Sequence, residues 1–173
     1  MNLWPLNPLE SQFNIRQARF PEDTEAVRQV FRDYQADINV DLCFQAFEEE
    51  LAGLPGKYVC IFLADGGCVG LRPYGGTTVE LKRLFVYRQA RGKGLGLLLM
   101  QTAIARAVEL GYTRMHLDTL KTKMPSAVRM YAALGFEEVP AGGGRTMPDL
   151  VDMELDLVLF MAKQRGTEET GSA

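Results

Sequence analysis

The chain has 173 residues, of which 47% are hydrophobic and 24% are charged, and its net charge is −3. This length and composition predict a globular protein with a hydrophobic core, and the weakly acidic balance argues against nucleic acid as a partner. The longest apolar run, residues 95–100, is far shorter than the roughly 20 residues that span a bilayer, so no membrane association is expected.

The cysteines and the single histidine narrow the chemistry further. Cys43, Cys60 and Cys68 show neither the even number nor the CxxC spacing that is typical of disulfide frameworks and zinc sites. His116 is expected to have a structural role, with a place in the acceptor cleft as the alternative, and no metal is expected. The N-terminus lacks the basic start of a secretory signal, so we expect a cytoplasmic protein.

The first half of the chain combines two predicted helices with short runs of strand-like sequence. Pro5 and Pro8 interrupt residues 1–13, which are expected to form an irregular lead-in. Two runs rich in β-branched and aromatic residues flank Gly66 and Gly67, a pattern that predicts a hairpin with these glycines in its turn. In chain order we expect a strand at 14–20, helices at 21–38 and 42–51, and strands at 57–65 and 68–74.

The second half contains the clearest helices. Residues 95–110 are expected to form one, followed by Gly111 as a left-handed stop, and Pro125 and Gly135 are typical boundary residues of another. The apolar stripe of the first of these helices consists of Leu97, Met100, Ile104, Ala107 and Val108. The other expected elements are strands at 77–86, 113–120, 136–140 and 151–160, a helix at 125–134, and a flexible tail at 164–173.

Three glycines alternate with other residues in the stretch RQARGKGLG, residues 88–96, between a predicted strand and a predicted helix. Because glycine is unfavourable inside regular elements, this density needs a physical reason. A helix start presents backbone N–H groups without helical partners, and residues that lack a side chain let a phosphate approach them. Arg88, Arg91 and Lys93 add positive charge. The stretch therefore predicts a phosphate or pyrophosphate site, with a tight turn and solvated charges as the alternative.

Two common phosphate motifs fit this stretch poorly. A P-loop requires Ser or Thr after its lysine, whereas Lys93 is followed by Gly94. A dinucleotide-binding fold requires GxGxxG after an early apolar strand, whereas Gly92, Gly94 and Gly96 form GxGxG after a charged strand. A nucleotide-binding protein that uses the same turn remains an alternative.

Residues 89–94, QARGKG, match the pattern Q/R-x-x-G-x-G/A. The match resembles the acyl-CoA pyrophosphate motif of the GNAT superfamily of N-acetyltransferases. ELKRLFV at 80–86 is similar to the central strand of that family, and AVRMYAALGFEEV at 127–139 is similar to its second motif. The order of predicted elements agrees over 14–160. The resemblance implies one acyltransferase domain over 1–173, of α/β (α+β) class, with a mostly antiparallel central mixed sheet, a splayed strand pair and helices on both faces.

The resemblance also implies acetyl-CoA as the co-substrate and assigns its contacts. The pyrophosphate is expected at a continuous run of residues: Gln89, Ala90, Arg91, Gly92, Lys93, Gly94, Leu95 and Gly96. The backbone of Leu84, Phe85 and Val86 is expected to pair with pantetheine like an additional strand and to donate to the thioester carbonyl. The implied reaction is direct transfer of the acetyl group to a primary amine.

Two side chains are assigned to proton transfer by the same resemblance. The amine must lose a proton before it attacks, because a lysine-type ammonium has a pKa of about 10.4. Glu80 corresponds to the family's base and would act through a water, because about 13 Å of extended strand separate it from the thioester segment. Asp118 is the reserve base, and Tyr131 is expected to protonate the leaving thiolate. The alternatives are that Glu80 pairs with Lys82 or Arg83, and that Tyr131 is a core residue.

The acceptor is left open by the sequence. Arg145, in the loop at 141–149, favours a carboxylate. The first two predicted helices favour a cationic amine, unless their acidic residues form a solvated face: Asp33, Asp37, Asp41, Glu48, Glu49 and Glu50. We expect a small-molecule or peptide amine acceptor and a monomer or homodimer. A CoA-binding regulatory or structural module without catalysis is the alternative function.

Overall fold

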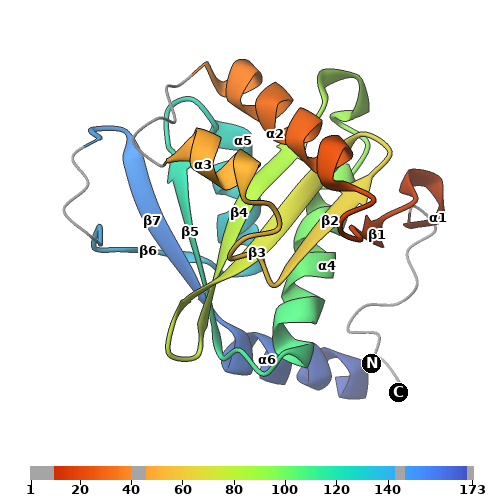
Figure 1. Ribbon diagram of the computed structural model, residues 1–173. Coiled ribbons are helices and arrows are strands. Elements are labelled where there is room, and N and C mark those ends of the chain that lie inside the picture. The colour runs from red at the N-terminus through yellow and green to blue at the C-terminus, as the bar shows by residue number, and fades with distance from the viewer. Residues whose placement is uncertain (1–9, 40–45, 143–146, 171–173) are drawn as a thin grey trace. The chain divides into compact units, whose positions relative to one another are not determined.

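The computed structural model describes residues 10–39, 46–142 and 147–170. Its described strands form one seven-stranded mixed sheet in the order β1-β2-β3-β4-β5-β7-β6 (Figure 1). The elements are α1 (Glu10–Phe13), β1 (Arg16–Gln17), α2 (Thr24–Ile38), α3 (Phe47–Ala52), β2 (Cys60–Ala64), β3 (Gly67–Gly75), β4 (Thr78–Val86), the 3-10 turn η2 (Arg88–Ala90), α4 (Leu95–Glu109), β5 (Arg114–Leu120), α5 (Pro125–Leu134), β6 (Glu137–Val139), β7 (Leu150–Asp156) and α6 (Leu157–Thr170). The predicted α/β class with a mostly antiparallel sheet is confirmed.

Contacts divide the chain into two compact units. The N-terminal unit contains the described residues of 4–73 and 81–103, and the C-terminal unit contains 74–80 and the described residues from 104 onward. Strand β4 and helix α4 are continuous elements that contribute residues to both units.

The hairpin of the N-terminal unit turns one residue earlier than expected. Ala64 pairs with Gly67, so Asp65 and Gly66 form the two-residue turn, and Gly67 belongs to β3. Gly66 has a φ of 126°, which a residue with a side chain rarely adopts. Gly67 is a glycine for another reason, because a Cβ atom there would lie 2.3 Å from the carbonyl oxygen of Phe85.

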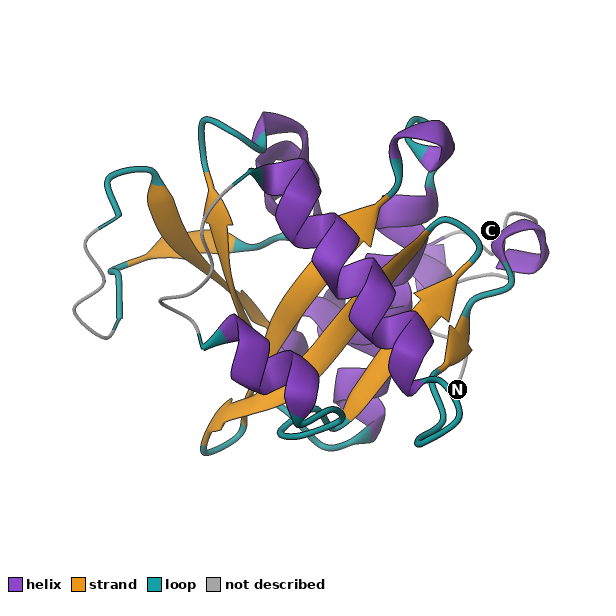
Figure 2. Cartoon of the chain, turned by 45° about the horizontal axis from the view of Figure 1, so that its top comes forward, coloured by secondary structure: helices purple, strands orange, loops and turns teal. Residues whose placement is uncertain are grey.

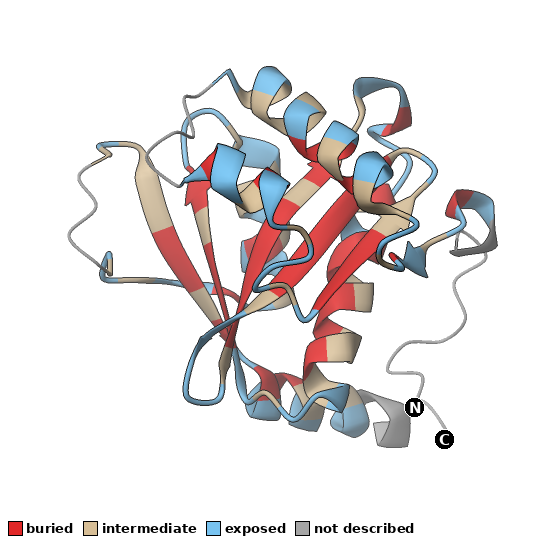
Figure 3. Cartoon of the chain, in the orientation of Figure 1, coloured by how far each residue is buried: buried red, intermediate tan, exposed pale blue. Residues whose placement is uncertain are grey.

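Helices α2 and α3 pack on the strands of the N-terminal unit (Figure 2). The helical spacing that predicted α2 produces this contact, because residues three and four apart share one side of a helix. The resulting core consists of Ala18, Val27, Val30, Phe31, Phe47, Leu51, Ile61, Cys68 and Phe85. In Figure 3, β2 and β3 are buried along much of their length, whereas the outer side of α2 is exposed.

The buried stripe of helix α4 overlaps the predicted one, because Met100, Ile104 and Ala107 are buried as expected. Leu97 is 40% exposed, so its assignment to the buried stripe is wrong, and Val108 is only half-buried. The buried positions begin with Leu95 and continue at helical spacing as Leu98, Leu99, Met100, Ala103, Ile104 and Ala107. The prediction chose Leu97 as the first buried residue, but several leucines in the first turn fit the same helical spacing. The sequence alone does not show which of them faces the core.

The C-terminal unit is built around β5. The first residues of β4, 78–80, pair in parallel with residues 114–116 of β5. Strand β5 pairs with β7 in antiparallel orientation over its whole length, and β7 pairs with β6. Helix α5 begins at Pro125 and is followed by Gly135, whose φ is 100°, as predicted from these two residues.

The end of the chain differs from the expected strand at 151–160. Strand β7 ends at Asp156 and α6 begins at Leu157. Asp156 accepts a hydrogen bond from the backbone N–H of Leu159 at 2.9 Å, which is the geometry of a helix N-cap. Leu157 and Phe160 are buried and Leu159 is exposed, as helical spacing requires. Helix α6 continues to Thr170, through most of the segment predicted as a flexible tail.

Candidate functional site

The glycine turn joins β4 to α4 within the N-terminal unit. Gly92 and Gly94 have φ values of 73° and 87°, so both occupy the left-handed region that favours glycine. No atom lies within 4 Å of a Cβ built on Gly92, and the space beside it is therefore open. The backbone N–H of Leu98 donates to the carbonyl of Gly94 at 3.1 Å, so the N–H groups of residues 95–97 belong to the unpaired first turn of α4. This geometry is compatible with the anion site that the sequence predicts.

The β2–β3 turn contacts the glycine turn directly. The backbone N–H of Tyr87 donates to the carbonyl of Gly66 at 2.8 Å. Ala90 is buried, and a Cβ atom on Gly66 would lie only 2.7 Å from the Cβ of Ala90. Leu95, at the start of α4, is 1% exposed. These contacts hold the glycine turn in place without a ligand.

Two arginines of the turn bind one carboxylate of α2. The Asp37 carboxylate accepts hydrogen bonds from Arg91 Nη2 at 2.6 Å and from Arg88 Nε at 3.2 Å. Arg91 Nε also donates to the carbonyl of Val86 at 2.9 Å. Partial burial opposes ionisation of Asp37, but the hydrogen bonds and charges of both arginines outweigh it and lower the pKa of this carboxyl. Lys93 is exposed.

The acidic residues of the first two helices are used mainly for such internal contacts. Asp33 accepts a hydrogen bond from the Tyr87 hydroxyl at 2.6 Å. Glu50 binds Arg83 through two hydrogen bonds, from Nε at 3.1 Å and from Nη2 at 2.7 Å. The alternative of a solvated face holds for Glu48 and Glu49, which are exposed, but not for Asp33, Asp37 and Glu50. Asp41 and Arg145 lie outside the described residues.

The Arg83–Glu50 ion pair is buried beside the predicted thioester segment. The side chains of Arg83 and Glu50 are 2% and 11% exposed, respectively. The Tyr58 hydroxyl donates to Glu50 Oε1 at 2.7 Å, and the Arg83 guanidinium lies 5.1 Å from the centre of the Phe47 ring. Arg83 itself has a φ of 57° inside β4. Leu84, Phe85 and Val86 follow directly.

The ionisation of this pair follows from its surroundings. Burial raises the pKa of Glu50, but the hydrogen bonds and charge of Arg83 outweigh it, so the pKa lies below its ordinary value. A carboxyl whose pKa is lowered by folding stabilises the folded state above its unfolded-state pKa. This contribution is lost only as the pH falls through the lowered pKa, and the pair is therefore charged at neutral pH.

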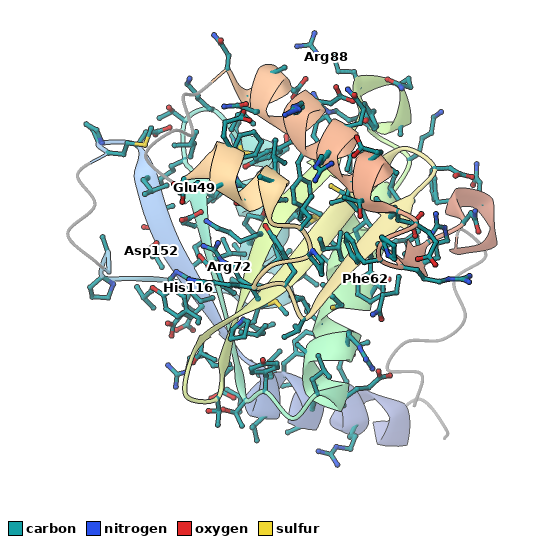
Figure 4. All side chains as sticks on the ribbon, in the orientation of Figure 1. Glu49, Phe62, Arg72, Arg88, His116 and Asp152 are labelled. Atoms are coloured by element: carbon teal, nitrogen blue, oxygen red, sulfur yellow. The ribbon has the colours of Figure 1, made fainter. Side chains whose placement is uncertain are left out.

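A cavity of about 290 Å³ opens beside Glu50 in the N-terminal unit. Its walls come from α3, from the loop before β2 and from β3, and Figure 4 labels two of the charged residues among them, Glu49 and Arg72. The full lining consists of Ala46, Glu49, Glu50, Gly53, Pro55, Gly56, Lys57, Tyr58 and Arg72. The size and mixed charge suit a small polar molecule.

A polar face lies on the sheet of the C-terminal unit. Directly paired residues on neighbouring strands point to the same face. Glu80 pairs with His116, His116 with Glu154, and Asp118 with Asp152. Alternation along β5 places His116 and Asp118 on one face as well. The predicted base Glu80, which is 3% exposed, and the reserve base Asp118 are thereby brought to the same face.

His116 is the centre of this polar face. Its Nε2 lies 3.6 Å from Asp152 Oδ1 and its Nδ1 lies 3.5 Å from Glu154 Oε1 (Figure 4). The ring is 2% exposed and stacks on Tyr74, with ring centres 4.1 Å apart and an interplanar angle of 10°. The sequence shows a lone histidine and no signal for this arrangement, because both carboxylates come from a strand more than thirty residues away.

The predicted acid Tyr131 lies on α5 and is 4% exposed. Its ring centre is 5.8 Å from that of Phe136, at an interplanar angle of 55°. Both the predicted acid and the predicted base therefore belong to the C-terminal unit, whereas the glycine turn and the predicted thioester segment belong to the N-terminal unit.

The described cysteines, Cys60 and Cys68, are both buried, and they do not form a disulfide. Burial raises the pKa of the Cys68 thiol well above its ordinary value, which disfavours a nucleophilic thiolate. Cys43 lies outside the described residues. Among residues 10–39, 46–142 and 147–170, no three metal-ligating side chains are placed to hold an ion. No helix in these ranges has the length and apolar character needed to cross a bilayer.

Comparison with known proteins gives a consistent result. Residues 14–136 match the model of the acetyltransferase (GNAT) family. An uncharacterised N-acetyltransferase of Schizosaccharomyces pombe is 34% identical over 158 residues, which cover 85% of this chain and 96% of that protein. An uncharacterised N-acetyltransferase of Escherichia coli, YjgM, is 27% identical over 160 residues, covering 84% and 91% of the two chains.

Solved structures share the fold. A GNAT-family acetyltransferase of Staphylococcus aureus Mu50 superposes with a TM-score of 0.69 at 22% identity, covering 84% of this chain and 99% of its own. The structure of yncA from Salmonella typhimurium, solved with acetyl-CoA, has a TM-score of 0.61 at 21% identity and covers 84% and 94% of the two chains.

Proposed function

Because the chain belongs to the GNAT acetyltransferase family, we propose that it transfers an acetyl group from acetyl-CoA to a primary amine of a small molecule or peptide. The observation that carries this proposal is the glycine turn before α4, where Gly92 and Gly94 have positive φ values and the space beside Gly92 is open. The yncA structure contains acetyl-CoA as its cofactor, and the same co-substrate is proposed for this chain.

The cofactor would bind along the N-terminal unit. Residues 89–96 would hold the pyrophosphate through backbone N–H groups and the positive end of α4. Arg88 and Arg91 would act partly through Asp37, which fixes the turn against α2, while Lys93 is exposed and able to reach a phosphate. Residues 84–86 would carry pantetheine and the thioester.

The chemistry requires the primary ammonium to lose two protons before it is an amide nitrogen, and the leaving sulfur to gain one. In the proposed reaction the ammonium proton passes through a water to the Glu80 carboxylate, and the amine nitrogen then attacks the thioester carbon. The attacking nitrogen then releases its second proton to solvent, and the C–S bond breaks as the Tyr131 hydroxyl donates its proton to the leaving sulfur. A proton from solvent restores the Tyr131 hydroxyl. Direct attack is preferred to a covalent intermediate because Cys60 and Cys68 are buried.

Replacement of the proposed acid tests this assignment. Tyr131→Phe is expected to lower kcat by about tenfold or more, because the departing thiolate loses its proton donor, while acetyl-CoA affinity changes little. The measurement is thiol release with the best amine from a screen, at saturating concentrations of both substrates. Tyr112→Phe, a half-buried tyrosine of the same unit, is the control. An unchanged kcat in Tyr131→Phe would remove this residue from the mechanism.

Ligand-dependent thermal unfolding tests the cofactor. A ligand that binds only the folded state adds about 2.7 kcal/mol at 100 times its Kd. We expect acetyl-CoA and CoA, each measured separately, to raise the Tm, and NAD and ATP to leave it unchanged. Stabilisation by NAD or ATP alone would contradict the proposal and favour a nucleotide-binding protein. Binding of acetyl-CoA without thiol release across a broad amine screen would favour a non-catalytic CoA-binding module.

A further inference from the structure

Strand β4 contains a backbone conformation that needs an explanation. Of the non-glycine residues with positive φ in the described chain, Arg83 is the one that lies inside a strand. A residue with a side chain pays a steric penalty in this region, and such residues persist only where their surroundings hold them. The penalty at Arg83 therefore requires contacts that fix it.

The Arg83 side chain makes those contacts. We call the group formed by Arg83, Glu50 and Tyr58 the clamp. Two hydrogen bonds join the guanidinium to both carboxylate oxygens of Glu50, and the Tyr58 hydroxyl adds a third bond to the carboxylate. The rings of Phe47 and Tyr34 lie 5.1 Å and 5.7 Å from the guanidinium carbon. The bidentate geometry and the flanking rings leave the side chain one orientation.

Stability alone is a weak reason for such a clamp. Removing two charges from water has a cost that the attraction between them often only balances, and apolar residues of similar volume frequently serve as well. A buried ion pair that holds a strained backbone is better explained by a role of the residues that follow it in the strand.

We call the left-handed conformation at Arg83 the bend of β4. Its position along the strand indicates a function. Arg83 directly precedes Leu84, the first residue of the proposed thioester segment. Its carbonyl oxygen accepts a hydrogen bond from Cys68 Sγ of β3 at 3.2 Å, which adds a side-chain contact between β3 and β4 at this residue. A left-handed residue rotates the strand that follows and changes the direction of its N–H groups.

We propose that Arg83 and Glu50 are positioning residues for acyl transfer: the clamp holds β4 in its left-handed bend, and the bend aims the backbone N–H groups of residues 84–86 at the thioester carbonyl. This proposal rests on the proposed function, since it presupposes that acetyl-CoA lies along this segment. Neither side chain takes part in proton transfer.

The test observes the thioester carbonyl itself and needs no acceptor. Acetyl-CoA labelled with ¹³C at the carbonyl is bound to each variant, and the infrared stretch of that carbonyl is compared with its value in water. Aimed N–H donors polarise the C=O bond and lower its frequency. The wild type and Glu49→Gln, an exposed neighbour on α3, are expected to show the full lowering.

The decisive variant removes both charges. The double variant Glu50→Leu with Arg83→Met is expected to fold, because no charge is left unpaired. It should bind labelled acetyl-CoA with nearly unchanged Kd, since the glycine turn is intact, and lose the lowering of the carbonyl frequency. Arg83→Gly should retain more of the lowering than Arg83→Ala, because glycine adopts a φ near 57° without a steric penalty.

Distinct outcomes separate this proposal from the proposed function. If the wild type does not bind acetyl-CoA, the proposed function fails. If it binds but the double variant shows the full lowering, or if the wild type shows none, the clamp proposal is overturned and the function is untouched. Equal losses in Arg83→Gly and Arg83→Ala would also overturn it, because they would assign the effect to the arginine side chain and not to the bend.

Discussion

Gly92→Val is expected to raise the Kd for acetyl-CoA by about 100-fold or more, equivalent to about 2.8 kcal/mol of binding free energy. Gly92 has a φ of 73°, and the space where its Cβ would lie is open. A valine would fill that space with two methyl groups beside the first N–H groups of α4. The pyrophosphate could then no longer approach the backbone, because an N–H···O hydrogen bond requires the nitrogen and oxygen to lie about 2.7–3.2 Å apart. Isothermal titration with acetyl-CoA measures the change.

The control for this substitution must reproduce its backbone strain. Gly111, after α4, has a φ of 84° and likewise has no atom within 4 Å of an ideal Cβ. Gly111→Val should therefore lower the Tm by a similar amount while keeping the wild-type Kd. A folded Gly92→Val variant that binds acetyl-CoA as tightly as Gly111→Val would contradict the assignment of the pyrophosphate to this turn.

Gly67→Ala is expected to produce the largest loss of stability. The added Cβ would lie 2.3 Å from the carbonyl oxygen of Phe85 and 3.2 Å from Leu99 Cδ1. Real Cβ atoms do not approach a carbonyl oxygen this closely, so the contact between β3 and β4 at this point must open. We expect a destabilisation of about 3 kcal/mol or more, at the upper end for overpacked cores. For a chain of this size, this corresponds to a fall in Tm of about 10 °C.

Thermal and urea unfolding measure this loss, with a second glycine as the control. Gly166 lies in α6 with no atom near its ideal Cβ, and Gly166→Ala is expected to leave the Tm unchanged or to raise it slightly, because alanine favours the helix. A Gly67→Ala variant as stable as Gly166→Ala would show that β3 and β4 are not held as closely as described. Since Phe85 belongs to the proposed thioester segment, Gly67→Ala should also weaken acetyl-CoA binding where it still folds.

Several elements were predictable because their signals are local. Pro125 and Gly135 mark the two ends of α5, and each acts through its own φ angle. The strand, the glycine turn and the start of α4 follow one another without interruption in the sequence, so their order alone predicted an anion site. The resemblance to the GNAT family rested on these same contiguous stretches, and the family model confirms it.

Errors arose where two local signals competed. The alternating stretch before residue 160 predicted a strand throughout, although Asp156 is a good N-cap and begins α6. At the hairpin, Gly66 and Gly67 look equivalent in sequence, but the first provides a positive φ and the second provides space for the carbonyl of Phe85. Only the position of the neighbouring strand distinguishes these two reasons for a glycine.

The sequence by itself determined the family, the order of most elements and the position of the glycine turn, because each depends on residues that are close together along the chain. Only the tertiary structure decided the partners of the charged residues. Arg83 was named only as an alternative partner of Glu80, and the structure shows it bound to Glu50, 33 residues away. His116 lies between two carboxylates of β7. A charge pattern shows which residues need a partner once they are buried, but the register and packing of distant elements select that partner.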